Sequence, residues 1–419
     1  MATQNLGTSA SLSGADAVLK EYYPSAIVEQ LNNKTFLLDQ IDRDSEHIDF
    51  TGRRAIIPLH RNRNRGRSSI GDGGNLPSAG KQDWTDAVVQ IRYHASAIEI
   101  SDAAIAATKN NDGAFVSLLE AETKGVATDL KKDINRQVFG TGDGILASCV
   151  SNTGTTTAVI TVSSAQYIQV GDTVDIVVKS TGVAIAGGAA CLVTARNTAT
   201  PTVSVTTTGT VSVSSIHGLA LSGGAGANSA LLEMDGLRNI AATTGRTLHG
   251  VDSSNAANAF WDPQVIAAGG AVTDSLLMQL IDKVGQTGQG EVDTIITTRG
   301  IRRAYAASLT NNRRYNDAAA VKLHTGYTAI MVNEVPIITD DDAPKGFVFG
   351  FDKKAFKWFE LAKPGFLEQD SGIFTLKDGS VAGTKASIWQ AYFRWYAAFG
   401  CVAPNRTGAL TGVTDEAPV

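Results

Sequence analysis

The segment from residue 148 to residue 222 constrains the fold most, because it is nearly free of charge in a chain of 419 residues. It contains 4 charged residues, where the chain average of 18% would place about 13. Thr, Ser, Val and Gly dominate it, and short β-rich stretches are broken by Gly, Asn and Pro. This pattern predicts an inserted small all-β domain, a barrel or a sandwich. The four predicted strands are 157–162, 173–179, 189–195 and 202–207.

The residues before this segment predict one long helix over 112–139. Apolar residues recur there at spacings of three and four, which is the pattern of one helix face. Asp112 is the expected N-cap and Gly140 the expected residue after the helix end. Gly125 falls in the middle, where glycine costs about 1 kcal/mol relative to alanine. A long helix bends most readily at such a residue, so we expect a bend at Gly125.

Residues 49–100 predict a hairpin whose strands are 55–60 and 87–100, joined by a polar, Gly-rich tip. Six arginines fall within fifteen residues that contain no carboxylate: Arg53, Arg54, Arg61, Arg63, Arg65 and Arg67. In an extended segment the last four would share one face. The cluster is open to three interpretations: docking on an acidic protein surface, nucleic-acid binding, or a solvated loop.

No motif in the sequence predicts catalysis, and we expect no enzyme activity, metal or cofactor. The glycines of 140–144 follow a helix rather than precede one, so they predict a helix end and not a phosphate loop. The triplet 340–342, Asp-Asp-Asp, predicts a solvated turn. The six histidines show no metal-binding spacing, and the three cysteines are scattered, which suits a reducing cytoplasm.

The remaining composition bounds the class of protein. The net charge of −5 argues against a protein that mainly coats nucleic acid. No run of 18 apolar residues predicts a membrane span, and residues 1–14 lack a signal-peptide pattern. Residues 1–48 predict an arm with little apolar surface for a core of its own, in which Ile27, Leu31, Phe36 and Leu37 indicate a short helix and an apolar tether. From residue 228 a mixed pattern predicts helices 274–288 and 300–310, strands 291–298, 347–361 and 386–404, and a strand and a turn over 330–344.

The order of these elements resembles the major capsid protein of tailed bacteriophages, which has the Hong Kong 97-like fold. The resemblance rests on an arm, a basic hairpin, a long helix ending in RQVFGTGDG, and a mixed region containing EVDTIITTRGIRRAYAASL and GYTAIMVNEVPIITDDDAPKGFVFGFDKKA. It implies an α+β fold with an N-terminal arm (1–48), an E-loop hairpin (49–100), a spine helix with peripheral (P) domain (101–147) and an inserted β domain (148–227). The inserted β domain would be followed by an axial (A) domain with P-domain segments at its edges (228–345). The last part would be the P-domain return strands with the C-terminus (346–419).

The resemblance also implies a function and partners. Copies of the chain would assemble as hexamers and pentamers of an icosahedral head that encloses double-stranded DNA, packaged without sequence specificity. A separate scaffolding protein, a portal and decoration proteins are further candidate partners. The location would be the virion, with assembly in the host cytoplasm. The arginine cluster would meet carboxylates of a neighbouring subunit, for which we name Glu120, Asp129 and Asp133, with Glu360 and Glu368 as further candidates.

Other hypotheses stay open at this point. In the same fold, the chain could form the shell of an encapsulin-type bacterial compartment. A DNA-binding protein acting through Arg53–Arg67 is a third hypothesis, and a hydrolase with a site scattered in the sequence is a fourth without positive evidence. Some capsid proteins cross-link a hairpin Lys to an Asn of a neighbour, and Lys81 with Asn405 is one conceivable pair.

Overall fold

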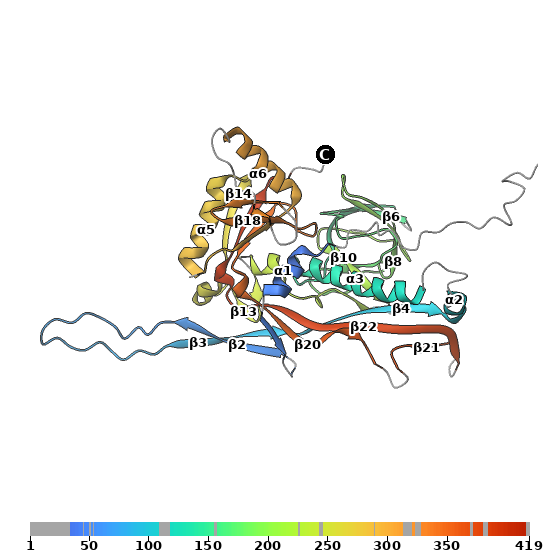
Figure 1. Ribbon diagram of the computed structural model, residues 1–419, viewed down its shortest axis with the longest axis horizontal. Coiled ribbons are helices and arrows are strands. Elements are labelled where there is room, and N and C mark those ends of the chain that lie inside the picture. The colour runs from blue at the N-terminus through green and yellow to red at the C-terminus, as the bar shows by residue number, and fades with distance from the viewer. Residues whose placement is uncertain are drawn as a thin grey trace, which may run out of the picture. The chain divides into compact units, whose positions relative to one another are not determined.

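The computed structural model describes residues 34–44, 46–49, 52, 54–108, 118–154, 157–224, 227–242, 246–288, 290–312, 321–322, 328–368, 372–379 and 384–415 (Figure 1). Its contacts divide the chain into two compact units. Unit 1 consists of Met1–Asn32, Ala97–Ala127 and Leu367–Tyr392, and unit 2 of Asn33–Ser96, Thr128–Phe366 and Phe393–Val419. The division falls inside three long elements: β4 (Arg92–Ser101), α3 (Leu118–Val138) and β22 (Lys385–Cys401).

Unit 1 contains helix α2 (Asp102–Thr108) and an antiparallel pairing of β21 (Thr375–Asp378) with the beginning of β22. Two polar contacts join its segments. The ammonium group of Lys377 lies 2.7 Å from the carboxylate of Glu99, and Trp389 Nε1 donates a hydrogen bond to Asp102 at 3.0 Å. These contacts connect parts of the chain that are 278 and 287 residues apart.

The main core of unit 2 packs against a sheet rich in aromatic residues. Strand β20 (Phe356–Phe366) of this sheet lies between β1 (Glu46–Asp49) and β22. Trp358 stacks on Trp395 with ring centroids 5.4 Å apart, and both are buried. Helix α1 (Phe36–Asp44) adds Leu37, Leu38 and Ile41 to the same core. Phe36 and Leu37, which predict a short helix and an apolar tether, lie in α1, and residues 1–33 lie outside the described part.

A second sheet of unit 2 is mixed and carries helices α5 (Asp274–Gly288) and α6 (Arg299–Asn312), as predicted (Figure 1). Leu280 and Val284 of α5 pack against Ile295 in its core, and all three are fully buried. The strand order is β14 (Gln264–Gly270), β23 (Thr407–Val413), β19 (Phe347–Phe351), β15 (Thr294–Thr297), β18 (Val335–Thr339), β17 (Thr328–Val332) and β16 (Val321–Lys322).

Three segments in which one strand was predicted each contain parts of two strands. The segment 87–100 breaks at Ile91 between β3 (Asp83–Gln90) and β4, 330–344 breaks between β17 and β18, and 347–361 breaks between β19 and β20. Asn333 and Glu334 have positive φ angles of 48° and 67°, which suit a tight hairpin turn. Asp352 accepts a hydrogen bond from the Lys354 N–H and begins η2 (Lys353–Ala355), which carries the chain from one sheet to the other.

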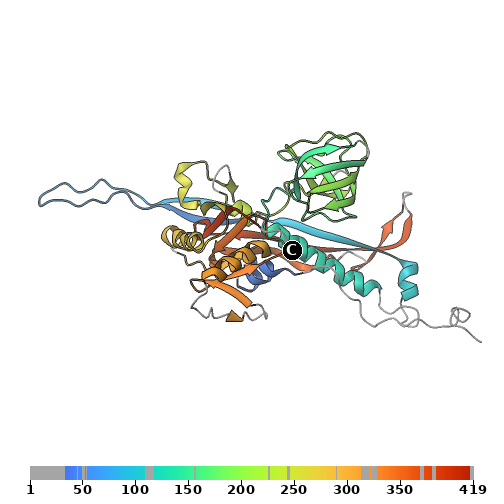
Figure 2. The same ribbon diagram turned by 90° about the horizontal axis from the view of Figure 1, so that it is seen from above.

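The charge-poor segment forms a closed antiparallel barrel with its own core (Figure 2). Strand β10 pairs with both β5 and β7, so the ring of strands closes, and of the two predicted alternatives the barrel is the one observed. The prediction missed β5 and β10, whose Ser- and Gly-rich sequences have weak strand composition. The strands are β5 (Ala147–Thr153), β6 (Thr157–Val162), β7 (Thr173–Val178), β8 (Cys191–Asn197), β9 (Thr202–Thr206) and β10 (His217–Gly224).

Helix α3 ends differently from the prediction. Gly140 has no positive φ, and the helix closes instead with short turns in which the Gly140 N–H donates to the Gln137 carbonyl at 2.8 Å. The nearby Gly236 is required by close approach, because a Cβ there would lie 2.4 Å from the Gln137 oxygen. Asp112 lies outside the described residues. The remaining short elements are β11 (Ala227–Asn228), α4 (Leu237–Ile240), β12 (Thr247–Leu248), β13 (Val251–Asp252), η1 (Ala256–Trp261) and η3 (Pro404–Arg406).

Candidate functional site: the arginine hairpin and its base

The hairpin formed by β2 (Arg54–Asn62) and β3 has two different faces. One face packs Leu59 and Ala87 into the core of unit 2. The opposite face leaves Ile56 55% exposed and Trp84 64% exposed, and the Trp84 ring lies 4.7 Å from the His60 ring. Ile56 is opposite Val88 and Trp84 is opposite His60, so the two exposed apolar side chains lie at separate positions of the same face.

The arginines of the predicted cluster have two kinds of surroundings: Arg61 contacts its own chain, and the arginines after it are exposed. Arg61 Nε donates to the Ala257 carbonyl at 3.1 Å, and its guanidinium lies 3.7 Å from Asp83. Strand β2 ends at Asn62, so the following arginines are not on a paired strand. The exposed arginines are Arg54, Arg63, Arg65 and Arg67, and Arg53 lies outside the described residues.

Gly66 and Gly80 allow the two arms of the hairpin tip to approach each other closely. A Cβ on Gly66 would lie 2.6 Å from the Gly80 nitrogen, and a Cβ on Gly80 would lie 2.5 Å from the Gly66 nitrogen. Asn64 Oδ1 accepts a hydrogen bond from the Gly66 N–H at 2.7 Å. Residues 63–80 are otherwise exposed, so this part of the hairpin buries almost nothing in its own chain.

The acidic residues that we named as partners for the arginines have different surroundings. Asp133 already accepts hydrogen bonds within the chain, from Arg136 at 2.9 Å and from Gln137 at 2.8 Å. Glu360 is buried and accepts from Trp395 Nε1 at 2.9 Å, so it offers no surface to a neighbour. Asp129 and Glu368 are exposed, and the side chain of Glu120 lies outside the described residues. A contact between the hairpin and a second copy stays a prediction.

The sequence did not reveal a buried ion cluster at the end of α3. Arg136 binds both oxygens of Glu233 at 3.0 and 2.5 Å, and Arg136 and Glu233 are both buried. Burial acts to raise the pKa of Asp133, but the adjacent Arg136 outweighs it and holds that pKa below its ordinary value. The Asp133–Arg136 spacing of three could be read from the sequence, whereas Glu233 lies 97 residues away. The cluster fastens α3 to the segment after the barrel.

The aspartate turn at 340–342 is not the solvated turn that we predicted. Asp340 and Asp342 are 3% and 7% exposed. Asp340 accepts from the Leu37 N–H at 2.8 Å and Asp342 from Lys132 Nζ at 2.8 Å, while Asn135 Nδ2 donates to both carboxylates. Donors from α1 and α3 therefore stabilise carboxylates that burial alone would disfavour.

The same turn also binds the barrel. Gln166 Nε2 donates to the Asp341 carbonyl at 2.7 Å, and the Tyr167 hydroxyl donates to the Asp342 carbonyl at 2.6 Å. The Asp341 side chain pairs with Arg299 at 2.6 Å. The aspartate turn thus joins α1, α3, α6 and the barrel.

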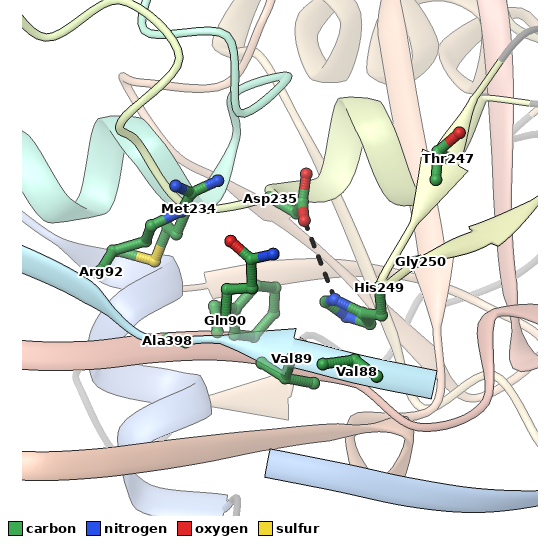
Figure 3. Close-up of a pocket in the computed structure, with 11 residues that line it drawn as sticks. Val88, Val89, Gln90, Arg92, Met234, Asp235, Thr247, His249, Gly250 and Ala398 are labelled. Atoms are coloured by element: carbon green, nitrogen blue, oxygen red, sulfur yellow. Dashed lines mark ion pairs between the residues drawn. The ribbon is translucent and has the colours of Figure 1, made fainter. Parts of the chain in front are cut away.

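A cavity of about 270 Å³ lies at the base of the hairpin, lined in part by Gln90, Arg92 and Met234 (Figure 3). His249 Nε2 accepts a hydrogen bond from the Cys401 N–H at 3.1 Å, and its Nδ1 lies 3.8 Å from the Asp235 carboxylate. Burial lowers the pKa of His249 to about 4, so the ring is neutral near pH 7. The His249 carbonyl accepts a hydrogen bond from the Val88 N–H of β3 at 2.7 Å, so this segment contacts the base of the hairpin directly.

Within the described residues, no three His, Cys, Asp or Glu side chains are placed to hold a metal ion. The three cysteines are buried, and burial raises the pKa of Cys401 to about 12, so its thiol is unreactive near neutral pH. Among the helices described, none is long and apolar enough to cross a membrane.

Comparison with known proteins identifies the fold. The sequence matches no protein-family model and no curated protein. The structure matches the capsid chain of cyanophage A-1(L) with a TM-score of 0.57 at 10% identity, covering 97% of this chain and 100% of the other. It matches the capsid of a native GTA particle with a TM-score of 0.52 at 9% identity, covering 97% and 99%. A third match is the SrpI encapsulin of Synechococcus elongatus, with a TM-score of 0.50 at 9% identity, covering 98% and 99%.

These matches confirm the predicted resemblance at the level of the fold. The chain has the fold of the solved phage capsid proteins, with the mixed helices and strands expected of the α+β class. At 9–10% identity the likeness concerns the fold alone.

Proposed function

We propose that this chain is the major capsid protein of a tailed bacteriophage, which assembles as hexamers and pentamers of an icosahedral head around double-stranded DNA. The observation that carries the proposal is the fold likeness to the cyanophage capsid chain over 97% of the sequence. The hairpin supports it, because Ile56, Trp84 and residues 63–80 are exposed in the single chain. Ordering such a segment costs entropy, which burial against a neighbouring copy would offset.

The proposal includes a non-enzymatic role in the virion, after assembly in the host cytoplasm. Scaffolding, portal and decoration proteins are the further partners that it implies, and the DNA would be held without sequence specificity. We propose the named division into arm, E-loop, spine helix, P and A domains and inserted barrel as part of the same function. The exposed arginines of the hairpin would serve contacts between copies.

The match to the encapsulin favours a second candidate, the shell of a protein compartment that encloses an enzyme. Expression of the full chain, followed by electron microscopy of the particles and analysis of their contents, separates the two. A head is expected to be icosahedral and to contain nuclease-protected DNA when produced in phage-infected cells. Particles that carry a cargo protein and no DNA would favour the compartment, and a chain that stays monomeric at high concentration would contradict both.

A further inference from the structure

The cavity at the base of the hairpin has an apolar side and a polar side. Its volume of about 270 Å³ lies just below the range of about 300–1,000 Å³ that is typical of pockets for drug-sized ligands, so it suits a smaller molecule. The lining residues Met234, Ala398 and Phe399 are at most 2% exposed and provide apolar surface. Gln90 and Thr247 also line the cavity and are exposed, so a ligand can reach it from solvent.

The ring of His249 presents a hydrogen-bond donor to this cavity. Its Nε2 accepts from the Cys401 N–H at 3.1 Å, so the proton of the neutral ring is on Nδ1. Nδ1 lies 3.8 Å from the Asp235 carboxylate, which is too far for a hydrogen bond, and no other described residue bonds to it. Figure 3 shows the His249 and Asp235 side chains directed toward each other. The Nδ1–H group is therefore available to a ligand.

Two opposite charges line the cavity without pairing with each other. Asp235 Oδ1 accepts a hydrogen bond from Asn239 Nδ2 at 2.6 Å, whereas Oδ2 receives none from the described residues. Arg92 donates to the Leu231 carbonyl at 3.4 Å, and none of the described carboxylates lies within ion-pair distance of its guanidinium. Burial raises the pKa of Asp235, so a cation placed beside Oδ2 would stabilise the charged carboxylate.

We propose that this cavity binds a zwitterionic α-amino acid with an apolar side chain. The ammonium group of the ligand would bind Asp235 Oδ2, and its carboxylate would accept from Arg92 and from His249 Nδ1. The apolar side chain would pack on Met234 and Phe399. A ligand with both charges compensates both lining charges, whereas a simple anion or cation leaves one of them unpaired. The proposal does not depend on the proposed shell.

Calorimetric titration of the full-length protein with free amino acids tests the ligand class. The probes are L-leucine, L-methionine and L-phenylalanine, and at least one of them is expected to bind. Isoamylamine is leucine without its carboxylate, and 4-methylpentanoate is leucine without its amino group. Each lacks one charged contact and is expected to bind about tenfold or more weakly than L-leucine. No binding of the three amino acids at millimolar concentrations, or equal binding of leucine and its two analogues, would overturn the proposal.

Two conservative variants assign each charge of the ligand to its residue. In Arg92→Gln the preference for L-leucine over isoamylamine is expected to disappear, and in Asp235→Asn the preference over 4-methylpentanoate. A variant that only disturbed the fold would weaken all probes alike. Arg67→Gln and Asp72→Asn make the same changes on the exposed hairpin tip and are expected to keep both preferences. If Arg92→Gln and Asp235→Asn also keep them, the cavity is not the binding site.

Hydrogen exchange in the unmodified protein gives a measurement that needs no variant. The Val88 N–H donates to the His249 carbonyl at 2.7 Å beside the cavity. An amino acid bound to the His249 ring is expected to slow the exchange of this amide, while exchange in residues 63–80 of the tip stays unchanged. Binding that leaves the exchange of Val88 unaltered would place the ligand elsewhere and contradict the proposal.

Discussion

Two buried histidines make the stability of unit 2 depend on pH. Burial lowers the pKa of both His94 and His249 from 6.5 to about 4. Between these values the unfolded chain binds protons that the folded chain does not, so the free energy of unfolding falls as the pH decreases from 6.5 to 4. Each histidine is expected to contribute a loss of about 3 kcal/mol over this range. The loss is complete below pH 4 and absent above pH 6.5.

Denaturant unfolding at several pH values measures this dependence. The double variant with His94→Gln and His249→Gln is expected to show a flatter decline between pH 6.5 and 4 than the unmodified chain, whatever its stability at pH 7. His60→Gln is the control, because His60 is exposed on the hairpin and its replacement is expected to preserve the decline. Parallel pH profiles for the unmodified chain and the double variant would show that other groups cause the dependence.

At the scale of the element, Gly125 is a glycine in the interior of α3. A Cβ at this position would meet no atom within 4 Å, so Gly125→Ala introduces no clash. It is expected to stabilise the protein by about 1 kcal/mol, because alanine has the higher helix propensity. Thermal or denaturant unfolding measures the gain, and Ala127→Gly on the same helix should show a loss of similar size.

The same residue tests whether α3 bends. The division between the two units falls between Ala127 and Thr128, two residues after Gly125. We expect α3 to bend at or near Gly125 in at least one state of an assembled particle, and Gly125→Ala to reduce the bend. Particle structures before and after filling would measure it, and a helix that is straight through Gly125 in both would rule the bend out.

The helices and strands that were predicted correctly are those whose hydrophobic pattern involves residues close to each other in the sequence. Helices α5 and α6 and strand β6 follow local periodicity, and their predicted bounds agree with the structure to within two residues. The breaks at Ile91 and Asp352 were missed because both flanks have strand composition, and only pairing with different sheets separates them. The amino-acid composition of a strand does not indicate which sheet the strand will join.

The candidate site was predictable in part for the same reason. The arginine cluster is contiguous in sequence, so its exposure on a hairpin tip could be foreseen. The burial of Asp340 could not, because its donors Leu37 and Asn135 lie 303 and 205 residues away. The cavity beside His249 is likewise built from four separate segments of the chain.

The barrel is the element whose independence can be tested by removal. Its core is a separate cluster of buried residues between Leu146 and Leu219. Replacing 148–222 by a short Gly/Ser linker is expected to leave a folded chain that loses the hydrogen bonds of Gln166 and Tyr167 to the aspartate turn, at about 1 kcal/mol each. Circular dichroism and unfolding curves would measure this. A fragment of residues 145–226 that shows no cooperative unfolding would argue against an independent domain.

At the scale of the whole molecule, buried carboxylates and the exposed arginines of the hairpin tip have different surroundings. The chain uses its buried carboxylates internally, as Asp340 and Glu233 show, and leaves the arginines of the hairpin tip exposed. The guanidinium groups of Arg63, Arg65 and Arg67 have no hydrogen-bond or ion-pair partner within the residues that the structure describes. Unpaired like charges on one loop repel each other unless carboxylates or phosphates approach them. A second copy, with its net charge of −5, is a ready source of carboxylates.

Replacing Arg63 and Arg65 with Glu tests whether the hairpin tip holds copies together. The double variant is expected to fold normally, because residues 63–80 contribute almost nothing to the core. Each exposed pair contributes only about 0.2–1 kcal/mol, but a shell repeats the contact in every copy, so we expect assembly to fail or to become sensitive to salt.

Arg63→Gln with Arg65→Gln is the matched variant, since it removes the charge without reversing it, and a smaller defect is expected. Light scattering and electron microscopy at several salt concentrations measure assembly. Normal particles at ordinary ionic strength would show that the tip is not an electrostatic contact, and particles that form but lose their DNA would assign the arginines to the nucleic acid instead.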